Sequence, residues 1–388
     1  MRRIRRLGTA VAGLVVTLTV TATAQTSRSG GITPVASMRV RSETLNWFGD
    51  SPGGAYSFLA GTARLGLERQ RPRLGWRIEF AAPVLLGLPD DAIEPAPRGL
   101  LGAGANYYKA NDNTRNSIHL FLKQAYLRVR TRDLRWQGRG GRFEFMEGAE
   151  GSPSNATLAA IKRTRIAQRL IGPVGFSHVG RSFDGVDLQF NRGTTNVTVM
   201  AGLPTTGVFT ADGWGEVGQV GLGYASVTAP GPWSGGSDRS EFRLFGIYYR
   251  DSRNILKVDN RSLARRQEDL EPITVETLGA HYLQQIPTGA GAVDLLGWGA
   301  VQFGEWGRQR HRAFAGTVEV GWQPDVARGL LPWMRLGYFR SSGDRDPADP
   351  THGTFFPLLP TSRMYSRFPF YNLMNLEDLS ASVTVRPG

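Results

Sequence analysis

Cysteine is absent from the chain of 388 residues. An exported protein of this size without disulfides must be held together by its own architecture. After the first twenty residues the sequence also lacks any apolar run long enough to form a transmembrane helix. These two absences argue against a disulfide-stapled scaffold and against a helical membrane protein.

Histidine is scarce, and recognisable catalytic motifs are missing. The five histidines show neither H-E-x-x-H nor another metal-binding spacing: His119, His178, His281, His311 and His352. No G-x-S-x-G elbow and no phosphate-binding loop occur. A lipase would need a serine–histidine pair, whereas a single histidine in a strand, such as His281, is more often a packed residue. We therefore predict that the protein is not an enzyme and needs no cofactor for catalysis.

Lysine is rare as well, and arginine takes its place. The four lysines are Lys109, Lys123, Lys162 and Lys257, so 42 of the 46 basic residues are arginine. A GC-rich genome explains this bias as well as anion handling does, since the arginine fork grips carboxylates and phosphates. We expect no nucleic-acid partner. Glycine is abundant, with 49 residues, against a usual share of ~7%.

The first 24 residues have the pattern of a secretory signal peptide. Four arginines, Arg2, Arg3, Arg5 and Arg6, precede a short apolar segment, and Ala22-Thr23-Ala24 is a suitable cleavage site. A membrane anchor is the alternative, but the apolar segment is short for a span. Cleavage after Ala24 would leave residues 25–388 as one domain and reduce the formal net charge from +13 to +9, because the leader carries four arginines and no acid.

Many later segments alternate with a period of two. In residues 312–323, Phe314, Val318 and Trp322 share one face with other apolar residues, whereas the opposite face is small or polar. Residues 59–68, 73–81, 183–191 and 332–340 repeat this pattern. An apolar face bounded by aromatic residues is typical of a lipid-facing barrel strand. The sequence contains about fourteen strand candidates in all, each of the ~9–11 residues usual for such strands. The sequence therefore predicts an all-β fold, a transmembrane antiparallel outer-membrane β-barrel. A soluble β-sandwich or β-helix is the competing interpretation.

The connections between these segments alternate in length. Short ones surround Pro72, Gly193 and Pro287, and long ones cover residues 84–114 and 204–216. Bacterial barrels have short periplasmic turns and longer extracellular loops. One long connection contains the basic segment Thr157–Leu170, whose apolar residues recur at roughly helical spacing. Two placements stay open for this helix, either inside the lumen or solvated outside the barrel.

A second long connection, GDRDPADPTHGTFFPLLPTSRMY at residues 343–365, is rich in proline and yet apolar. Proline excludes it from a sheet interior, so Phe355, Phe356, Leu358 and Leu359 are predicted to pack at the barrel mouth or to fold inward as a lid. Asp344, Asp346 and Asp349 are candidate Ca²⁺ ligands. Their spacing does not match an EF-hand, and aspartate is also an ordinary turn former.

The stretch GYFRSSGDRDPADPTHGTFFPLLPT at residues 337–361 resembles a strand-and-loop signature of the alginate export family of outer-membrane proteins. Residues 169–186 and 134–145 are similar to further regions of that family. The resemblance implies an eighteen-stranded barrel with an arginine-rich lumen that exports an anionic polysaccharide. The last predicted strand, residues 379–385, is followed by Arg386-Pro387-Gly388, a turn signal. We therefore expect the chain to lack the last strands of such a barrel.

From these observations we predict an anion-selective outer-membrane channel for an anionic polysaccharide or a smaller anionic solute, with passive transport. The expected partners are outer-membrane lipid and lipopolysaccharide, the transported anion and periplasmic export proteins. A structural or binding barrel with a plugged lumen is the alternative. The predicted lumenal anion-binding residues are Arg64, Arg77, Arg135, Arg139, Arg243 and Arg335, and the predicted constriction helix contributes Lys162, Arg163, Arg165 and Arg169.

Overall fold

The computed structural model describes residues 17–18, 31–46, 51–95, 99–232, 238–326, 329–361 and 372–386. Most of these residues are in strands. In chain order the elements are β1 (Thr17–Leu18), β2 (Thr33–Asn46), β3 (Ala55–Gln70), β4 (Leu74–Leu86), α1 (Gly102–Ala110), β5 (Ser117–Ile118), β6 (Phe121–Arg130), β7 (Trp136–Phe143), α2 (Ala156–Ile161), a π-helical turn η1 (Lys162–Ile166), β8 (Phe183–Arg192), β9 (Thr195–Pro204), β10 (Val220–Ala229), β11 (Ser240–Asp251), α3 (Leu263–Glu268), β12 (Ile273–Thr288), β13 (Gly291–Trp306), β14 (Gln309–Pro324), β15 (Trp333–Ser341), β16 (Thr351–His352) and β17 (Glu377–Thr384).

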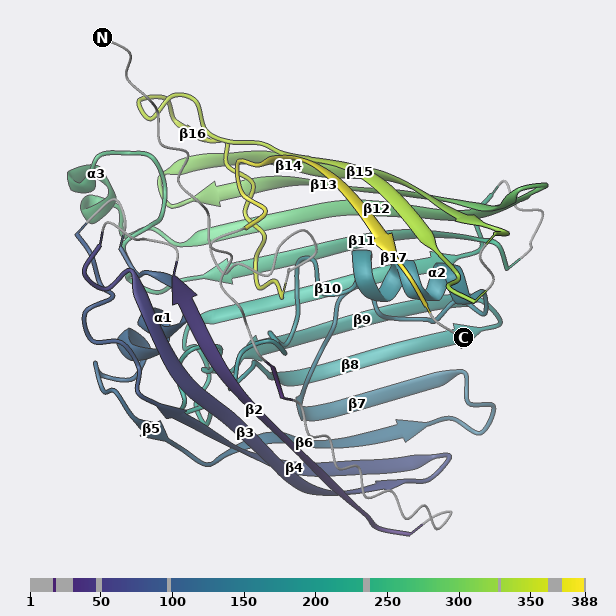
Figure 1. Cartoon of the computed structure of the whole chain (residues 1–388), viewed down its shortest axis with the longest axis horizontal. Coiled ribbons are helices and arrows are strands. Elements are labelled where there is room, and N and C mark those ends of the chain that lie inside the picture. Colours follow the sequence, from purple (N-terminus) through teal and green to yellow (C-terminus); the bar gives the residue numbers. More distant parts are fainter. Residues whose placement is uncertain are drawn as a thin grey trace.

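The long strands form one antiparallel sheet that curves into a barrel wall (Figure 1). Each long strand pairs with its neighbour along the chain, from β2 through β3, β4 and β6 to β15 and β17. The described residues include fourteen strands of eight residues or more. The prediction of an all-β antiparallel barrel with about fourteen strands is therefore confirmed. No helix among the described residues is long and apolar enough to cross a membrane.

The outer face of the wall is apolar. On β14, Val318 is 65% exposed and Phe314 48%, whereas their neighbours Thr317 and Glu319 are buried on the inner face. Leu65 on β3 and Leu336 on β15 are also more than 60% exposed. Such a continuous apolar surface is not expected to face water, but it suits the lipid-facing band of a barrel. The alternation in the sequence thus predicted correctly which side chains point outward.

The two ends of the barrel differ in the length of their connections. At one end, on the right in Figure 1, the connections include residues 71–73, 131–135, 193–194 and 289–290. At the other end they include residues 87–120, 144–182, 252–272 and 342–376, with a two-residue exception at 307–308. We name these the short-turn end and the long-loop end. The predicted long connection at 84–114 starts too early, because β4 continues to Leu86 and its last residues pair with β5.

The loop between β7 and β8, residues 144–182, turns into the barrel; we call it the α2 loop. Near the short-turn end, Asn155 caps α2 by accepting from the N–H groups of Thr157 and Leu158, and its amide donates to Gln285 of β12 at 2.7 Å. The loop then returns along the wall and reaches β2, where Arg39 donates to the Gly175 carbonyl at 2.6 Å. Of the two placements considered for the basic helix, the lumenal one is correct. The helix is shorter than the predicted Thr157–Leu170, since η1 ends at Ile166.

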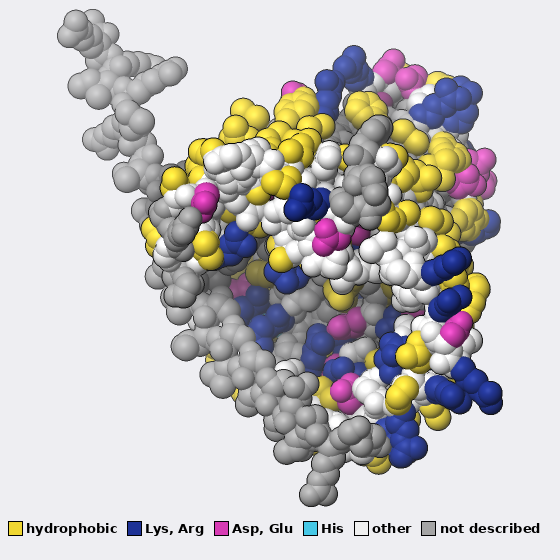
Figure 2. Space-filling view, turned by 90° about the vertical axis from the view of Figure 1, so that its right-hand side faces the viewer, with side chains coloured by type: hydrophobic (Ala, Val, Ile, Leu, Met, Phe, Trp, Pro, Cys, Tyr) yellow, Lys and Arg dark blue, Asp and Glu magenta, His cyan; other side chains and the backbone are white. Residues whose placement is uncertain are grey.

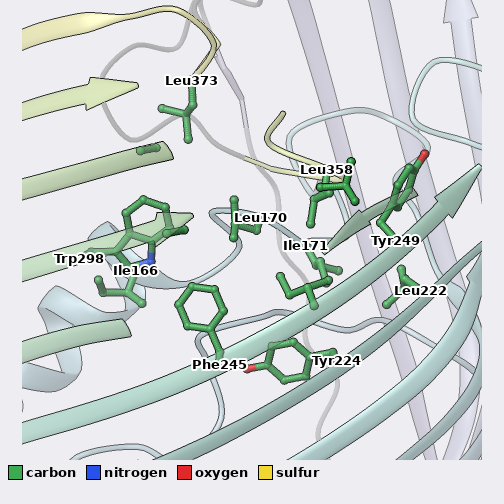
Figure 3. Close-up of a cluster of buried hydrophobic side chains, with 14 of the residues drawn as sticks. Ile166, Leu170, Ile171, Leu222, Tyr224, Phe245, Tyr249, Trp298, Leu358 and Leu373 are labelled. Carbon is green, nitrogen blue, oxygen red and sulfur yellow. The ribbon is translucent and has the colours of Figure 1, made fainter. Parts of the chain in front are cut away.

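A hydrophobic cluster fills part of the lumen beside this loop (Figure 3). Leu170 and Ile171 of the α2 loop lie beside Tyr224 and Phe245 of β10 and β11, and the ring of Trp298 on β13 lies close by. Gly279 of β12 is opposite Phe245, and a side chain there would overlap the Phe245 ring. The interior between β8 and β15 is therefore packed like a protein core rather than filled with water.

The segment 342–361, which we call the β16 loop, joins this core. Phe355 is fully buried, and the Gln302 side chain of β13 both donates to the Phe356 carbonyl at 2.6 Å and accepts from its N–H at 2.8 Å. Leu359 forms a parallel bridge with Ile171 of the α2 loop. The predicted signal peptide lies outside the described residues except for Thr17–Leu18, which pairs with β2. Its cleavage and the further strands of a complete barrel stay predictions.

Candidate functional site: the arginine-lined lumen

The inner faces of β2, β3, β4, β6 and β7 carry a row of arginines. Seen from the short-turn end, the molecule is hollowed, and Lys, Arg, Asp and Glu side chains lie in the hollow (Figure 2). Strand register places two of these arginines directly opposite each other, Arg128 on β6 and Arg139 on β7. The row consists of Arg39, Arg41, Arg64, Arg77, Arg128, Arg130 and Arg139, whereas the inward carboxylates of the same strands are Glu43, Glu68 and Glu79. We call this surface the arginine wall.

Three of the predicted anion-binding residues belong to the arginine wall and keep partial exposure. The side chain of Arg64 is 25% exposed, that of Arg77 23% and that of Arg139 18%. Each has a carboxylate partner: Arg64 lies 3.1 Å from Glu144, Arg77 lies 3.3 Å from Glu68, and the Arg139 Nε donates to Asp187 at 2.6 Å. The pairing holds the guanidinium groups in place and neutralises part of their charge.

Other members of the arginine wall have no carboxylate partner within ion-pair distance among the described residues. Arg39 donates to two backbone carbonyls, those of Gly175 and Ser177. Arg128 is opposite Arg139, and its Nε is buried without a hydrogen-bond partner. Like charges directly opposite each other on a sheet are unfavourable. Arg39, Arg128 and Arg130 were not among the predicted site residues, although their alternation with Met38, Leu127 and Val129 was a readable signal that they face inward.

Arg243 and Arg335, two further predicted anion-binding residues, have a different environment. Arg243 is fully buried, and its NH1 donates to Glu147 of the α2 loop at 2.9 Å. Arg335 is 8% exposed and pairs with Asp294 and Glu319. Glu147 ties Arg243 directly to the α2 loop, whereas Arg335 shares Glu319 with Arg165 of that loop. Both arginines are inward-facing, as predicted, but both are buried in ion pairs.

Arg135 does not lie in the lumen, and its predicted position was wrong. It belongs to the exposed turn 131–135 between β6 and β7, where the Asp133 carboxylate accepts hydrogen bonds from the Thr131 hydroxyl and from the Arg135 N–H. These bonds lower the pKa of Asp133. The aspartate thus stabilises the turn that precedes β7, and the strand itself begins only at Trp136.

The four basic residues of the predicted constriction differ in how far they are buried. Lys162 is buried, with its Nζ 2.9 Å from Glu241 of β11, and Arg169 is buried over the Trp298 ring at 4.6 Å. Burial lowers the pKa of Lys162, against the opposing effect of Glu241. Arg165 is 16% exposed and pairs with Glu319 at 2.8 Å, and Arg163 is exposed. Three of the four, Lys162, Arg165 and Arg169, therefore hold the loop in place, although Arg165 keeps some exposure, and only Arg163 of the four is exposed.

Where the α2 loop meets β2, His178 is enclosed by charged groups. Its Nε2 lies 2.9 Å from both Glu43 and Arg41, and burial lowers the pKa of the imidazole. Nearby, burial of Glu144 is outweighed by Lys123 and Arg64, which together lower the pKa of this carboxyl group. Both groups belong to contacts that fasten the loop to the arginine wall.

The predicted lid residues do not form a lid. Phe355 and Leu358 are buried in the lumenal core, and Phe356 and Leu359 pack against it. The Leu359 N–H donates to the Leu170 carbonyl at 2.9 Å, and its own carbonyl accepts from the Gly172 N–H at 2.9 Å. Of the two predicted placements, the inward fold is correct. However, backbone hydrogen bonds join the segment to the α2 loop, so it is part of the internal packing rather than a cover over the mouth.

The three candidate calcium ligands do not converge in the structure. Each aspartate accepts a hydrogen bond from a backbone N–H two residues later, in the pairs Asp344–Asp346, Asp346–Ala348 and Asp349–Thr351. These are turn-forming bonds. Within the part of the chain that the structure describes, no group of three or more His, Cys, Asp or Glu residues is arranged to hold a metal ion. Calcium binding by this loop stays an untested prediction.

The curved antiparallel wall, its apolar exterior and its charged hollow define an outer-membrane β-barrel channel. A family model described as alginate export matches residues 163–388, more than half of the chain. The protein therefore belongs to the alginate export family and resides in the bacterial outer membrane. The match starts inside the α2 loop and continues through the β16 loop. No curated protein sequence matches the chain significantly.

Three solved structures are similar to the chain at low sequence identity. OprB of Pseudomonas putida is 14% identical, with a TM-score of 0.46 over 80% of this chain and 75% of that chain. A BenF-like porin from Pseudomonas fluorescens is 8% identical, with a TM-score of 0.39 over 82% and 85% of the two chains. OmpT, an outer membrane protein of Vibrio cholerae, is 10% identical, with a TM-score of 0.31 over 92% and 99%.

Proposed function

We propose that this barrel passes an anionic solute, either a uronate-type polysaccharide or a smaller anion, along the arginine wall. The observation that carries the proposal is the excess of inward arginines over inward carboxylates on β2, β3, β4, β6 and β7. Alginate export is the description of the family, and the solute of this member is part of the proposal.

The mechanism follows from electrostatics in a narrow, low-dielectric passage. Fixed positive charges raise the local concentration of anions and repel cations. Arginines with carboxylate partners, such as Arg77, offer weak and partly neutralised contacts, so a carboxylate can enter and leave. Arg39 and Arg128, which have no such partner, supply the net positive potential. Passage is passive, down a gradient or coupled to periplasmic export partners, and involves no catalytic chemistry.

Planar-bilayer recordings test this proposal. We expect the wild type to be anion-selective, and we expect Arg39→Gln/Arg128→Gln to lose several-fold in the anion-to-cation permeability ratio, because both residues add charge without a paired carboxylate. Arg132→Gln/Arg135→Gln is the matched control, since it removes two arginines from the exposed turn 131–135. Cation selectivity or equal permeability in the wild type would refute the proposal, as would the same loss of selectivity in the control.

A specific observation also favours a second candidate, a binding or structural barrel with a closed lumen. The α2 loop crosses the interior from β12 to β2, and the β16 loop packs beside it. If these loops seal the passage, the wild type will show no conductance in bilayers. Replacement of residues 152–170 of the α2 loop by a Gly/Ser linker separates a sealed barrel from one that is merely narrowed.

A further inference from the structure

The outer surface of β13 and β14 changes character sharply at its long-loop end. Along β14 the outward residues are apolar from Trp322 to Phe314, and the next two outward residues are Arg312 and Arg310, both exposed. Arg308 follows in the two-residue turn 307–308 and is exposed as well. These three arginines form a cluster on the outside of the barrel, which we call the rim patch. It is separate from the lumen and from the arginine wall.

Strand geometry sets the height of the rim patch. From Trp322 to Phe314 the strand advances about 27 Å at ~3.4 Å per residue, which a tilt of ~40° reduces to about 21 Å across the membrane. This is close to the usual apolar band of ~25 Å. Arg312 and Arg310 therefore lie just beyond the hydrocarbon, at the level of lipid headgroups. Two other strands show the same order of outward residues, an aromatic followed by an arginine: Tyr248 and Arg250 on β11, and Tyr338 and Arg340 on β15.

The side chains of the rim patch are available for a ligand. Neither Arg310 nor Arg312 has an ion pair or a side-chain hydrogen bond within the described ranges of the chain, and both are exposed. Arg312 is opposite Phe303 on β13, so no carboxylate faces it across that strand pair. Glu305 is opposite Arg310 and lowers the net positive charge of the rim patch, and Arg308 compensates for it. Three forked donors within five residues suit the oxygen atoms of a phosphate group.

We propose that the rim patch binds the phosphate groups of lipid A, the membrane anchor of lipopolysaccharide. The long-loop end of a bacterial barrel faces the cell exterior, and lipopolysaccharide occupies the outer leaflet there. Its acyl chains would lie against the apolar face below the patch, over Phe314 and Val318, while Arg308, Arg310 and Arg312 hold the phosphates. Charge complementarity and the position directly above the apolar band select this occupant.

Calorimetric titration of the full chain in detergent with diphosphorylated lipid A tests the proposal. We expect Arg310→Gln/Arg312→Gln to bind at least about tenfold more weakly than the wild type, given the usual strength of a basic residue at an anionic lipid surface. Fully dephosphorylated lipid A should bind the wild type as weakly as diphosphorylated lipid A binds the variant. The control Arg132→Gln/Arg192→Gln removes two exposed arginines at the short-turn end and should bind like the wild type.

Several results would overturn the assignment. Unchanged affinity in the double variant, or equal affinity for the dephosphorylated lipid, would exclude phosphate recognition by these arginines. If phosphatidylglycerol micelles bind equally well, the rim patch recognises any anionic lipid surface and not lipid A in particular. Both variants are expected to fold, as judged by heat-modifiable gel mobility. If the double variant does not fold, Arg312→Gln alone is expected to weaken binding by a few-fold, and wild-type affinity in that variant would equally refute the proposal.

Discussion

At the scale of single residues, the partner of each inward arginine decides its role. Arg64, Arg77 and Arg139 share their charge with carboxylates but stay partly exposed, so they can still meet a solute. Arg243 is fully buried against Glu147, where no solute can reach it. The sequence places all four on inward faces by alternation, but it does not reveal which stretch of wall the α2 loop will cover.

Replacing Arg243 tests this distinction. We expect Arg243→Met to lower the free energy of unfolding by about 3–5 kcal/mol, because Glu147 would be left buried without its charged partner. Urea unfolding in detergent, followed by tryptophan fluorescence, measures the loss. Arg64→Met, whose side chain is 25% exposed, is the matched control and should cost no more than about 1 kcal/mol. Similar losses in the two variants would mean that Arg243 has no special structural role.

At the scale of elements, the α2 loop determines how much of the lumen is open. Ion pairs tie it to the wall, with Lys162 bound to Glu241 of β11 and Arg165 bound to Glu319 of β14. Periodicity predicts its basic helix but not where that helix lies, because periodicity describes only the local chain. The acidic partners that fix the loop inside the barrel lie 79 and 154 residues away in the chain.

Removing this element should enlarge the passage. We expect replacement of residues 152–170 by a Gly/Ser linker to raise the single-channel conductance at least about twofold, because the conductance of a pore follows its cross-section. Planar bilayers give the measurement. Replacing α3, none of whose residues is buried, is the control and should leave the conductance unchanged. Conductance that appears only after the deletion would identify the wild type as a sealed barrel, and no change would show that the loop does not narrow the path.

At the scale of the whole molecule, the unequal connections define an orientation. The short-turn end is expected to face the periplasm and the long-loop end the cell exterior. The hollow in Figure 2 is seen from the short-turn end, so in this orientation its mouth opens toward the periplasm. A polymer arriving from that side would meet Arg163 and the arginine wall before it reaches the β16 loop.

The absence of cysteine makes this orientation easy to test. A cysteine in place of Arg265, in exposed α3, should react with a membrane-impermeant maleimide on intact cells, whereas a cysteine in place of Ala290, in the turn 289–290, should not. After the outer membrane is permeabilised, both should react. Labelling of Ala290→Cys but not of Arg265→Cys on intact cells would reverse the orientation and also move the rim patch to the periplasmic leaflet.

The alternation of apolar and polar residues along the chain was enough to predict the strands, their outward faces and the class of the barrel. Alternation with a period of two is a local property, since each lipid-facing residue must be apolar whatever its distant neighbours are. Arg335 between Met334 and Leu336 could be placed inward for this reason alone. Even the inward arginines that were not predicted, such as Arg128 between Leu127 and Val129, carried the same signal.

Which charged side chains face the passage depends on long-range packing and turn geometry. Arg135 lies in a turn held by Asp133 and not on the wall. Arg243 is buried against Glu147 of the α2 loop. Phe355 of the β16 loop packs in the core and not over the mouth. Each of these outcomes depends on contacts or turn geometry that no strand pattern encodes. Burial and ion pairing are set by what folds against a side chain, and in this barrel that is a loop whose partners lie on distant strands.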